Sequence, residues 1–230
     1  TKRFARQTIL SEIGHEGQAR LSKSRVLCIG VGGLGSPASL YLAAAGVGTI
    51  GLIDPDRIET SNLQRQILFK NSDQGIEKVF AAKEHLSQLN PDIKIETLNE
   101  TFSAHNAALL LSRYDLLIDG SDNFETRFLV NDACFKFDIP FVYGAVDHFE
   151  GQVALFHGAR SACYRCLFPA PPKALVRNCA ETGVLGAVVG AIGTLQATLA
   201  LQYLISGGDS NHPLFPKLAE LTLLDLKGSW

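Results

Sequence analysis

The sequence predicts an α/β fold in which a mixed, mainly parallel sheet is flanked by helices. Apolar runs typical of buried strands alternate with helical segments through the first half of the chain, starting with the run 26–31. In the second half two strand-like runs, 141–146 and 151–156, follow each other directly. Consecutive strands with no helix between them pair antiparallel, so we expect a mixed sheet.

Length and charge restrict the class of protein. The 230 residues suffice for one large α/β domain with a proper core, or at most two small ones. We expect a single domain over 1–230, with a helical arm over 1–24 and two halves, 25–146 and 147–230. Lys plus Arg number 21 and Asp plus Glu 23, giving a net charge of −2. Without a basic excess, binding to nucleic acid or to an anionic membrane is not expected.

Cysteine usage indicates a reducing compartment. The five cysteines lie at 28, 134, 163, 166 and 179 and form one C-x-x-C pair. An odd count with this spacing favours metal-binding or reactive thiols over a disulfide framework. No charged-then-apolar signal begins the chain, so we expect a cytoplasmic protein.

A glycine cluster follows the first strand. Gly30, Gly32 and Gly35 fit G-x-G-x-x-G, with Gly33 among them, and an alanine-rich helix is expected over 35–46. This spacing suits a tight turn, a close backbone approach to phosphates and close packing of the next helix, whose N-terminus favours anions. The motif alone does not distinguish NAD, FAD and ATP, and the alternative is a turn that binds nothing.

The second strand strengthens the nucleotide interpretation. It is expected over 49–53 and ends at Asp54, 24 residues after Gly30. A Rossmann-like fold places there the carboxylate that accepts ribose hydroxyls. Strand, glycines, helix, strand and acid together predict a Rossmann-like nucleotide-binding fold.

A polar loop and a helix supply candidate phosphate ligands. The loop 54–66 includes Arg65, and a guanidinium there suits a triphosphate because its donors match phosphate oxygens. The alternative is a solvated loop capped by Ser61 or Asn62. A helix is expected over 76–89, and Lys78 near its start opposes the helix dipole unless an anion pairs with it.

Further strands are expected over 93–98 and 115–119, with a short helix over 105–111 between them. Asp122 and Asn123 follow the fourth strand, at the sheet edge where ligands bind in open α/β folds. Asp122 is therefore a candidate Mg²⁺ ligand. The alternative is that it caps the next helix, expected over 124–137.

The thiols of the second half have two candidate roles. Cys163 and Cys166 form half of a zinc site, which needs four ligands, and a second pair would lie beyond Trp230. The alternatives are a redox pair or two unligated thiols. Cys179 lies in a polar, Arg-flanked loop and is a candidate reactive thiol, or else an ordinary exposed cysteine.

The segment 183–205 is long and apolar enough for a membrane span. We expect a buried helix instead, because Gln196 and Gln202 interrupt the segment and it lacks basic flanks. Small residues at 186, 190 and 193 predict close packing against a helix or a second subunit. A last edge strand is expected over 218–226.

Several motifs in one order along nearly the whole chain resemble the ThiF/MoeB/HesA family, the prokaryotic relatives of ubiquitin-activating enzymes. They are the glycine turn 30–35, Asp54, Ser61-Asn62-Leu63-Gln64-Arg65-Gln66, Lys78, Ser121-Asp122-Asn123, Cys163-Tyr164-Arg165-Cys166 and Arg177-Asn178-Cys179. The continuation Gln66-Ile67-Leu68-Phe69 and the Arg-Asn-Cys triplet look slightly closer to ThiF than to MoeB.

The resemblance implies an ATP-dependent adenylyltransferase. Such enzymes bind Mg²⁺ and ATP and activate the C-terminal Gly-Gly carboxylate of a small ubiquitin-like sulfur carrier, of the ThiS or MoaD type. The products are an acyl-adenylate and pyrophosphate. A sulfur donor, either a cysteine desulfurase or a sulfurtransferase, then leads to a thiocarboxylate for thiamine or molybdopterin synthesis.

The resemblance also implies residue roles. Asp54 takes the ribose hydroxyls, and Asn62, Arg65 and Lys78 neutralise the triphosphate, within a nucleotide set that includes Ser61, Leu63 and Gln64. Asp122 holds Mg²⁺ with support from Asn123, and Arg6 reaches the phosphates of the neighbouring subunit in a homodimer. The half 147–230 carries the first zinc pair and binds the carrier, to which Cys179 can form a covalent sulfur link.

Two other functions remain open from the residues. An NAD-dependent oxidoreductase explains the glycines and Asp54 but leaves Arg65, Lys78 and Asp122 unexplained. A non-catalytic binder of a ubiquitin-like protein would not need these charged residues.

Overall fold

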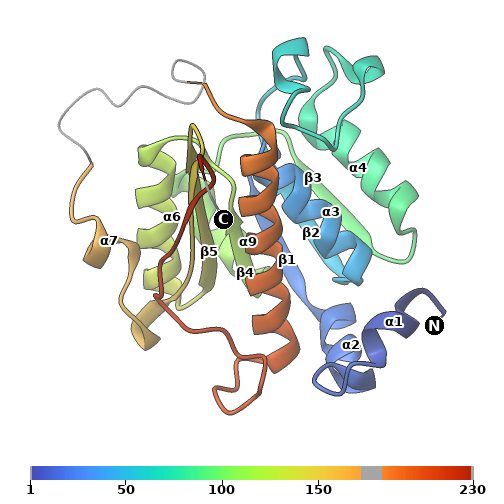
Figure 1. Ribbon diagram of the computed structural model, residues 1–230, viewed down its shortest axis with the longest axis vertical. Helices are drawn as coiled ribbons and strands as arrows, with labels where there is room; N and C mark the ends of the chain where they lie inside the picture. The colour runs from blue at the N-terminus through green and yellow to red at the C-terminus, as the bar shows by residue number, and fades with distance from the viewer. Residues whose placement is uncertain (1, 172–182, 229–230) are drawn as a thin grey trace.

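The computed structural model describes residues 2–171 and 183–228 (Figure 1). Its sheet has seven strands in the order β3-β2-β1-β4-β5-β6-β7. The first five strands along the chain are parallel, and β6 and β7 extend the sheet antiparallel. The strands are β1 Arg25–Ile29, β2 Thr49–Ile53, β3 Lys94–Leu98, β4 Leu116–Asp119, β5 Pro140–Asp147, β6 Glu150–His157 and β7 Thr222–Asp225. The predicted mixed α/β fold is thus confirmed.

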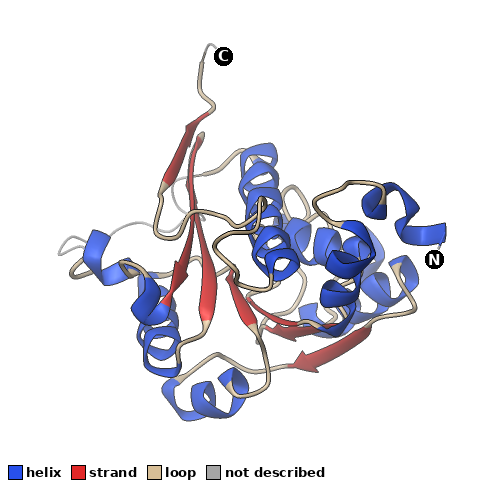
Figure 2. Cartoon of the chain, turned by 90° about the horizontal axis from the view of Figure 1, so that it is seen from below, coloured by secondary structure: helices blue, strands red, loops and turns tan. Residues whose placement is uncertain are grey.

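Helices cover both faces of the sheet (Figure 2). Helices α2, α3, α4 and α9 share one apolar cluster with the sheet, and α5, α6 and α7 share another. The helices are α1 Ala5–Thr8, α2 Gly14–Lys23, α3 Gly35–Ala45, α4 Lys78–Leu89, α5 Ala104–Leu111, α6 Phe124–Phe137, α7 Tyr164–Leu167 and α9 Gly186–Ser206. Short 3₁₀ turns are η1 Lys2–Phe4, η2 Thr60–Asn62, η3 Asn71–Asp73 and η4 Gly158–Arg160.

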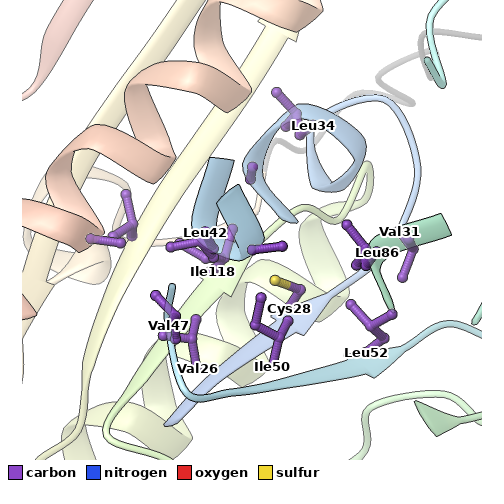
Figure 3. Close-up of a cluster of buried hydrophobic side chains, with 14 of the residues drawn as sticks. Val26, Cys28, Val31, Leu34, Leu42, Val47, Ile50, Leu52, Leu86 and Ile118 are labelled. Carbon is purple, nitrogen blue, oxygen red and sulfur yellow. The ribbon is translucent and has the colours of Figure 1, made fainter. Parts of the chain in front are cut away.

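The central strands are buried on both sides, as their continuous apolar runs predict. Val26, Cys28, Ile50 and Ile118 pack in the cluster under α3, where Figure 3 shows the Cys28 sulfur among apolar side chains. Burial raises the pKa of the Cys28 thiol to about 12. Cys28 is therefore a core residue.

Some predicted ends shift for identifiable reasons. Strand β1 stops at Ile29 rather than 31, because Gly30 adopts a left-handed φ of 83°. Helix α4 starts at Lys78 rather than 76, because Ile76 and Glu77 still pair with the loop at Ile58 and Arg57. The last edge strand, β7, spans Thr222–Asp225 and is therefore shorter than the predicted 218–226.

Helix α9 has the length and composition of a membrane span, but it packs as a core helix. It lies on the sheet beside α3 (Figure 1), and 56% of its most apolar window is buried. Gln196 is fully buried and its Nε2 donates to the carbonyls of Asp119 and Val142, at 2.7 and 3.2 Å. These bonds tie the middle of α9 to two parallel strands.

Candidate active site

A cleft lies at the carboxyl ends of β1, β2 and β4, where the sheet order reverses from β1 to β4. Its volume is about 370 Å³, within the range of small-molecule sites. Loops that follow parallel strands meet at this edge, so residues far apart in sequence line one cavity. Among the predicted residues, Gly30, Gly32, Gly33, Asp54, Arg65, Lys78, Asp122 and Asn123 line it.

The glycines of the turn differ in what they contact. A Cβ at Gly35 would lie 2.1 Å from the Gly30 carbonyl oxygen, and one at Gly33 would lie 2.7 Å from Val189 Cγ1. A Cβ at Gly32 would meet nothing closer than Gln66 Nε2, at 3.6 Å. Gly33 and Gly35 are therefore required by internal packing. The space beside Gly32 is open to the cleft, so a phosphate can approach the backbone closely there.

Asp54 joins the glycine turn to the loop after β2. Its side chain is almost fully buried and accepts hydrogen bonds from the backbone N–H groups of Val31 and Asp56, at 2.8 and 2.9 Å. Burial raises the pKa of Asp54, and the nearby Lys78 charge opposes that rise. The carboxylate thus holds the glycine turn against the loop after β2.

Lys78 has the anion partners that its position at a helix start requires. Its buried Nζ lies 2.7 Å from the Asp56 carboxylate and 3.8 Å from that of Asp54. Asp56 lines the cleft and was missed by the sequence reasoning. Its signal was the run Asp54-Pro55-Asp56 directly after a buried strand.

The Ser61–Gln66 run places Arg65 in the cleft, while several of its other residues build the local turn or pack against the core. Asn62 Oδ1 accepts from the backbone N–H of Glu59 at 3.2 Å and caps η2, and Arg65 Nη1 donates to the Ser61 carbonyl at 3.1 Å. Leu63 packs against the core. Ser61, Asn62, Leu63 and Gln64 do not line the cleft, so Arg65 is the one candidate nucleotide ligand of this run that lines it among the described residues. Gln66, which directly follows, is a further lining residue, and its buried Oε1 has no hydrogen-bond partner among the described residues.

Two roles were considered for Asp122, a metal ligand and a cap of the next helix, and the structure gives the cap to its neighbour Asn123. The Asn123 side chain accepts from the Thr126 N–H at 2.9 Å and caps α6. Asp122 is exposed at the cleft and makes no hydrogen bond or ion pair with any other residue that the structure describes. Its carboxylate is free for a ligand.

A buried acid lies beneath this loop. Asp119, at the end of β4, accepts from the N–H and hydroxyl of Ser121 at 3.0 and 2.6 Å. Its other carboxylate oxygen is buried and unpartnered within the described chain. Burial raises its pKa, and the positive charge of Arg127 acts against the rise.

The remaining predicted residues lie away from the cleft. Cys163 and Cys166 sit at α7 with their Sγ atoms 3.6 Å apart. Tetrahedral Zn–S bonds of about 2.3 Å require an S–S separation of about 3.8 Å, so this pair has the spacing of two zinc ligands. Residues 2–171 and 183–228 contain no group of three or more metal-binding side chains. Arg6 is exposed on α1 and does not reach the cleft of its own chain, and Cys179 lies outside the described residues.

Comparisons with known proteins agree with this geometry. The model of the ThiF family matches residues 4–228. The adenylyltransferase and sulfurtransferase MOCS3 of Anopheles gambiae is 47% identical over 205 residues, which cover 89% of this chain and 46% of that protein. The sulfur carrier protein adenylyltransferase of Thermus thermophilus is 46% identical over 212 residues, covering 90% and 78%.

Solved structures share the fold. Escherichia coli MccB crystallised with ATP superposes with a TM-score of 0.79 at 21% identity, covering 99% of this chain and 72% of that one. PaaA superposes with a TM-score of 0.78 at 23% identity, covering 98% and 70%. The chain spans about half the length of its MOCS3 relatives, with 46% and 47% of two of them matched. Because the family model runs through both halves of the sheet and the cleft between them, the chain belongs to the ThiF family.

Proposed function

We propose that the protein is an ATP-dependent adenylyltransferase that activates the C-terminal Gly-Gly carboxylate of a small ubiquitin-like sulfur carrier. A carboxylate oxygen attacks the α-phosphorus of ATP, an O–P bond forms, and the bond from that phosphorus to pyrophosphate breaks. The carrying observation is that Gly32, Arg65, Lys78 and Asp122, from four separate loops or elements, line one cleft. The name of the Thermus relative, a sulfur carrier protein adenylyltransferase, supports the same reaction.

The cations do electrostatic work in this reaction. Arg65 and Lys78 would stabilise negative charge that develops on the α-phosphoryl group and on pyrophosphate. Lys78 is held ready by Asp56 and Asp54, at 2.7 and 3.8 Å. Phosphate oxygens would take the place of the exposed Asp56 carboxylate, while buried Asp54 keeps the lysine oriented toward the ribose and phosphates.

Mg²⁺ fits the donors at the cleft. Asp122 offers an exposed carboxylate with no other partner in the described chain, and Mg²⁺ is held by one or two carboxylates together with substrate phosphates. When bound there, the ion would neutralise charge on the departing pyrophosphate. Asn123 supports this arrangement by fixing the start of α6.

Zinc fits Cys163 and Cys166 as one half of a structural site. Two residues of α6 fix the short helix α7, which carries this cysteine pair. Asn131 Oδ1 accepts from the Tyr164 N–H at 2.9 Å, and Arg165 forms two bonds of 2.6 Å with Asp132. The remaining ligands would come from outside the described residues. Metal analysis of the natural full-length protein tests this, and about one zinc per chain is expected, lost in Cys163→Ser.

A homodimer would bring Arg6 of one chain to the phosphates of the other. The exposed apolar residues support an interface, because Ile9, Tyr41 and Ile67 are 76%, 54% and 62% exposed. Tyr41, Ile67 and Leu89 line a second groove between α3 and α9. Light scattering is expected to give a dimer for the native chain and a monomer for Ile67→Asp.

The enzyme would act in the cytoplasm as one domain and serve thiamine or molybdopterin biosynthesis. A cysteine desulfurase or sulfurtransferase would supply the sulfur, with Cys179 as the thiol that can link to the carrier.

ATP–pyrophosphate exchange tests the activity. Purified protein is expected to exchange only with Mg²⁺ and a Gly-Gly-tailed carrier present, and Asp122→Ala is expected to lower the rate by about 10² or more. Exchange at full rate in Asp122→Ala would remove the role given to that carboxylate. Tight NAD binding without ATP binding would instead support an oxidoreductase, and ATP and carrier binding without exchange a non-catalytic member.

A further inference from the structure

We infer that Arg127 binds the terminal carboxylate of the incoming protein tail and orients it toward the α-phosphorus. This assignment rests on the proposed function and adds a residue to it. Arg127 lies one helical turn after Asn123 and lines the cleft on the β4–β5 side. Arg65 and Lys78, the other cations of the cleft within the described ranges, come from the loop after β2 and the start of α4.

The guanidinium of Arg127 is held in position. Its carbon Cζ lies 5.3 Å from the Phe124 ring centre and 5.8 Å from that of Tyr143, so the planar group is supported by two aromatic rings. Its Nη2 donates to the Ser121 carbonyl at 3.3 Å. A guanidinium fixed in this way loses little side-chain freedom when it binds a ligand.

Burial raises the pKa of the Tyr164 hydroxyl, and a hydrogen bond from Arg127 acts against that rise, so the guanidinium is also held there. Another of its donors remains unused. Its Nε is buried and has no hydrogen-bond partner within residues 2–171 and 183–228. The positive charge of Arg127 acts to lower the pKa of buried Asp119. No ion pair of 4.0 Å or less joins the two side chains among the described contacts. Unused donors on a preformed fork match a carboxylate, which accepts two parallel hydrogen bonds.

The location favours the tail over the nucleotide. The glycine turn, Asp54 and Lys78 occupy the β1–β2 side of the cleft, where a nucleotide lies in this fold. The lining also includes the apolar side chains of Val146, Val184 and Val189, of which Val189 lies beside Gly33 at the glycine turn. A narrow, uncharged glycine tail can lie along these apolar side chains with its carboxylate at the guanidinium. During the reaction one carboxylate oxygen forms the bond to phosphorus, and the other stays bound to Arg127 as the acyl carbonyl.

The test compares two forms of one carrier, ending in a carboxylate or in a carboxamide, with the native enzyme and Arg127→Gln. The carrier is the MoaD-type or ThiS-type protein that supports exchange. The native enzyme is expected to bind the carboxylate form about tenfold more tightly, which corresponds to about 1.4 kcal/mol. Arg127→Gln should bind both forms equally, with ATP affinity in the absence of carrier changed less than twofold. Added guanidinium chloride at millimolar concentration is expected to restore part of its exchange rate.

Controls separate this role from folding. Lys136→Ala, on the same helix with its Nζ 5.5 Å from the Phe137 ring, removes a cation away from the cleft and should discriminate the two carriers as the native enzyme does. Arg127→Lys keeps the charge for buried Asp119 but lacks the fork, and should recover only part of the discrimination. Equal discrimination by native enzyme and Arg127→Gln would overturn the inference and leave the proposed function standing, as would a loss confined to ATP affinity. No exchange in the native enzyme with any carrier would overturn the proposed function itself.

Discussion

At the residue scale, Gly32 and Gly35 lie in the same turn but for different reasons. A methyl group at 35 would collide with the Gly30 carbonyl at 2.1 Å, whereas one at 32 would enter the cleft near Gln66. Gly35→Ala is therefore expected to lower the free energy of unfolding by about 2–3 kcal/mol, the usual cost of overpacking. Gly32→Ala should leave stability within about 0.5 kcal/mol and weaken ATP binding about tenfold or more. Urea unfolding and ATP titration of both variants check this, and equal effects on stability would contradict it.

Asp122 and Asn123 are adjacent and separable in the same way. The Asn123 side chain caps α6, so Asn123→Ala should cost about 1 kcal/mol of stability. Asp122 is exposed and unpaired within the described chain, so Asp122→Ala should leave the melting temperature unchanged while exchange activity falls. Thermal unfolding of the two variants provides the measurement, and a lower melting temperature in Asp122→Ala alone would reverse the assignment of the cap.

At the element scale, the glycines of α9 show how the helix packs. A Cβ at Gly193 would lie 2.4 Å from the Leu34 carbonyl oxygen in the turn before α3, whereas one at Gly190 would meet nothing within 4 Å. Gly193→Ala is expected to destabilise the protein by about 2–3 kcal/mol. Gly190→Ala should be neutral or stabilise it by up to about 1 kcal/mol, because alanine favours a helix. Denaturant unfolding distinguishes them, and comparable losses would mean that α9 is packed differently.

The elements themselves were largely predictable from sequence. Apolar runs and breakers predicted β2 and α6 at their observed bounds, Thr49–Ile53 and Phe124–Phe137. Contacts between segments that are distant in the sequence could not be predicted, and these contacts decide where elements begin and which side chains meet. Helix α4 starts two residues late because Glu77 bridges to Arg57, and Lys78 meets Asp56 from another loop.

The same limit applies to the candidate site. Motif spacing predicted Asp54, Arg65, Lys78 and Asp122, all of which line the cleft. The family resemblance also selected Ser61, Asn62, Leu63 and Gln64, which belong to the same motif as Arg65, although Asn62 builds the 3₁₀ turn that presents the arginine. Arg127 was missed because its place in the cleft depends on where α6 starts relative to β4, a tertiary relationship.

At the scale of the whole molecule, the edge of the sheet opposite the cleft depends on one acid. Glu96 on β3 bonds to Lys94 at 2.7 Å, Arg113 at 2.8 Å and the Tyr114 hydroxyl at 2.9 Å, and pairs with Arg25 of β1 at 3.3 Å. Its side chain is 12% exposed. Burial alone would raise its pKa, but the bonds from Lys94 and Tyr114 and the charge of Arg25 outweigh it and lower the pKa from 4.5 to about 2.

This cluster predicts how acid unfolds the protein. A carboxylate whose pKa is lower in the folded state stabilises the fold above its unfolded pKa and loses that contribution as the pH falls through its folded pKa. For Glu96 the window runs from 4.5 down to about 2, and the contribution lost is about 3 kcal/mol. Glu96→Gln should lower the free energy of unfolding at pH 7 and flatten its decline between pH 4.5 and 2. Glu84→Gln, at an exposed position on α4, is the matched control and should follow the native curve. Urea unfolding across this pH range makes the measurement. If the native protein and Glu96→Gln lost stability in parallel, acid sensitivity would have to come from other carboxylates, such as Asp73 and Asp132, whose pKa values are also lowered.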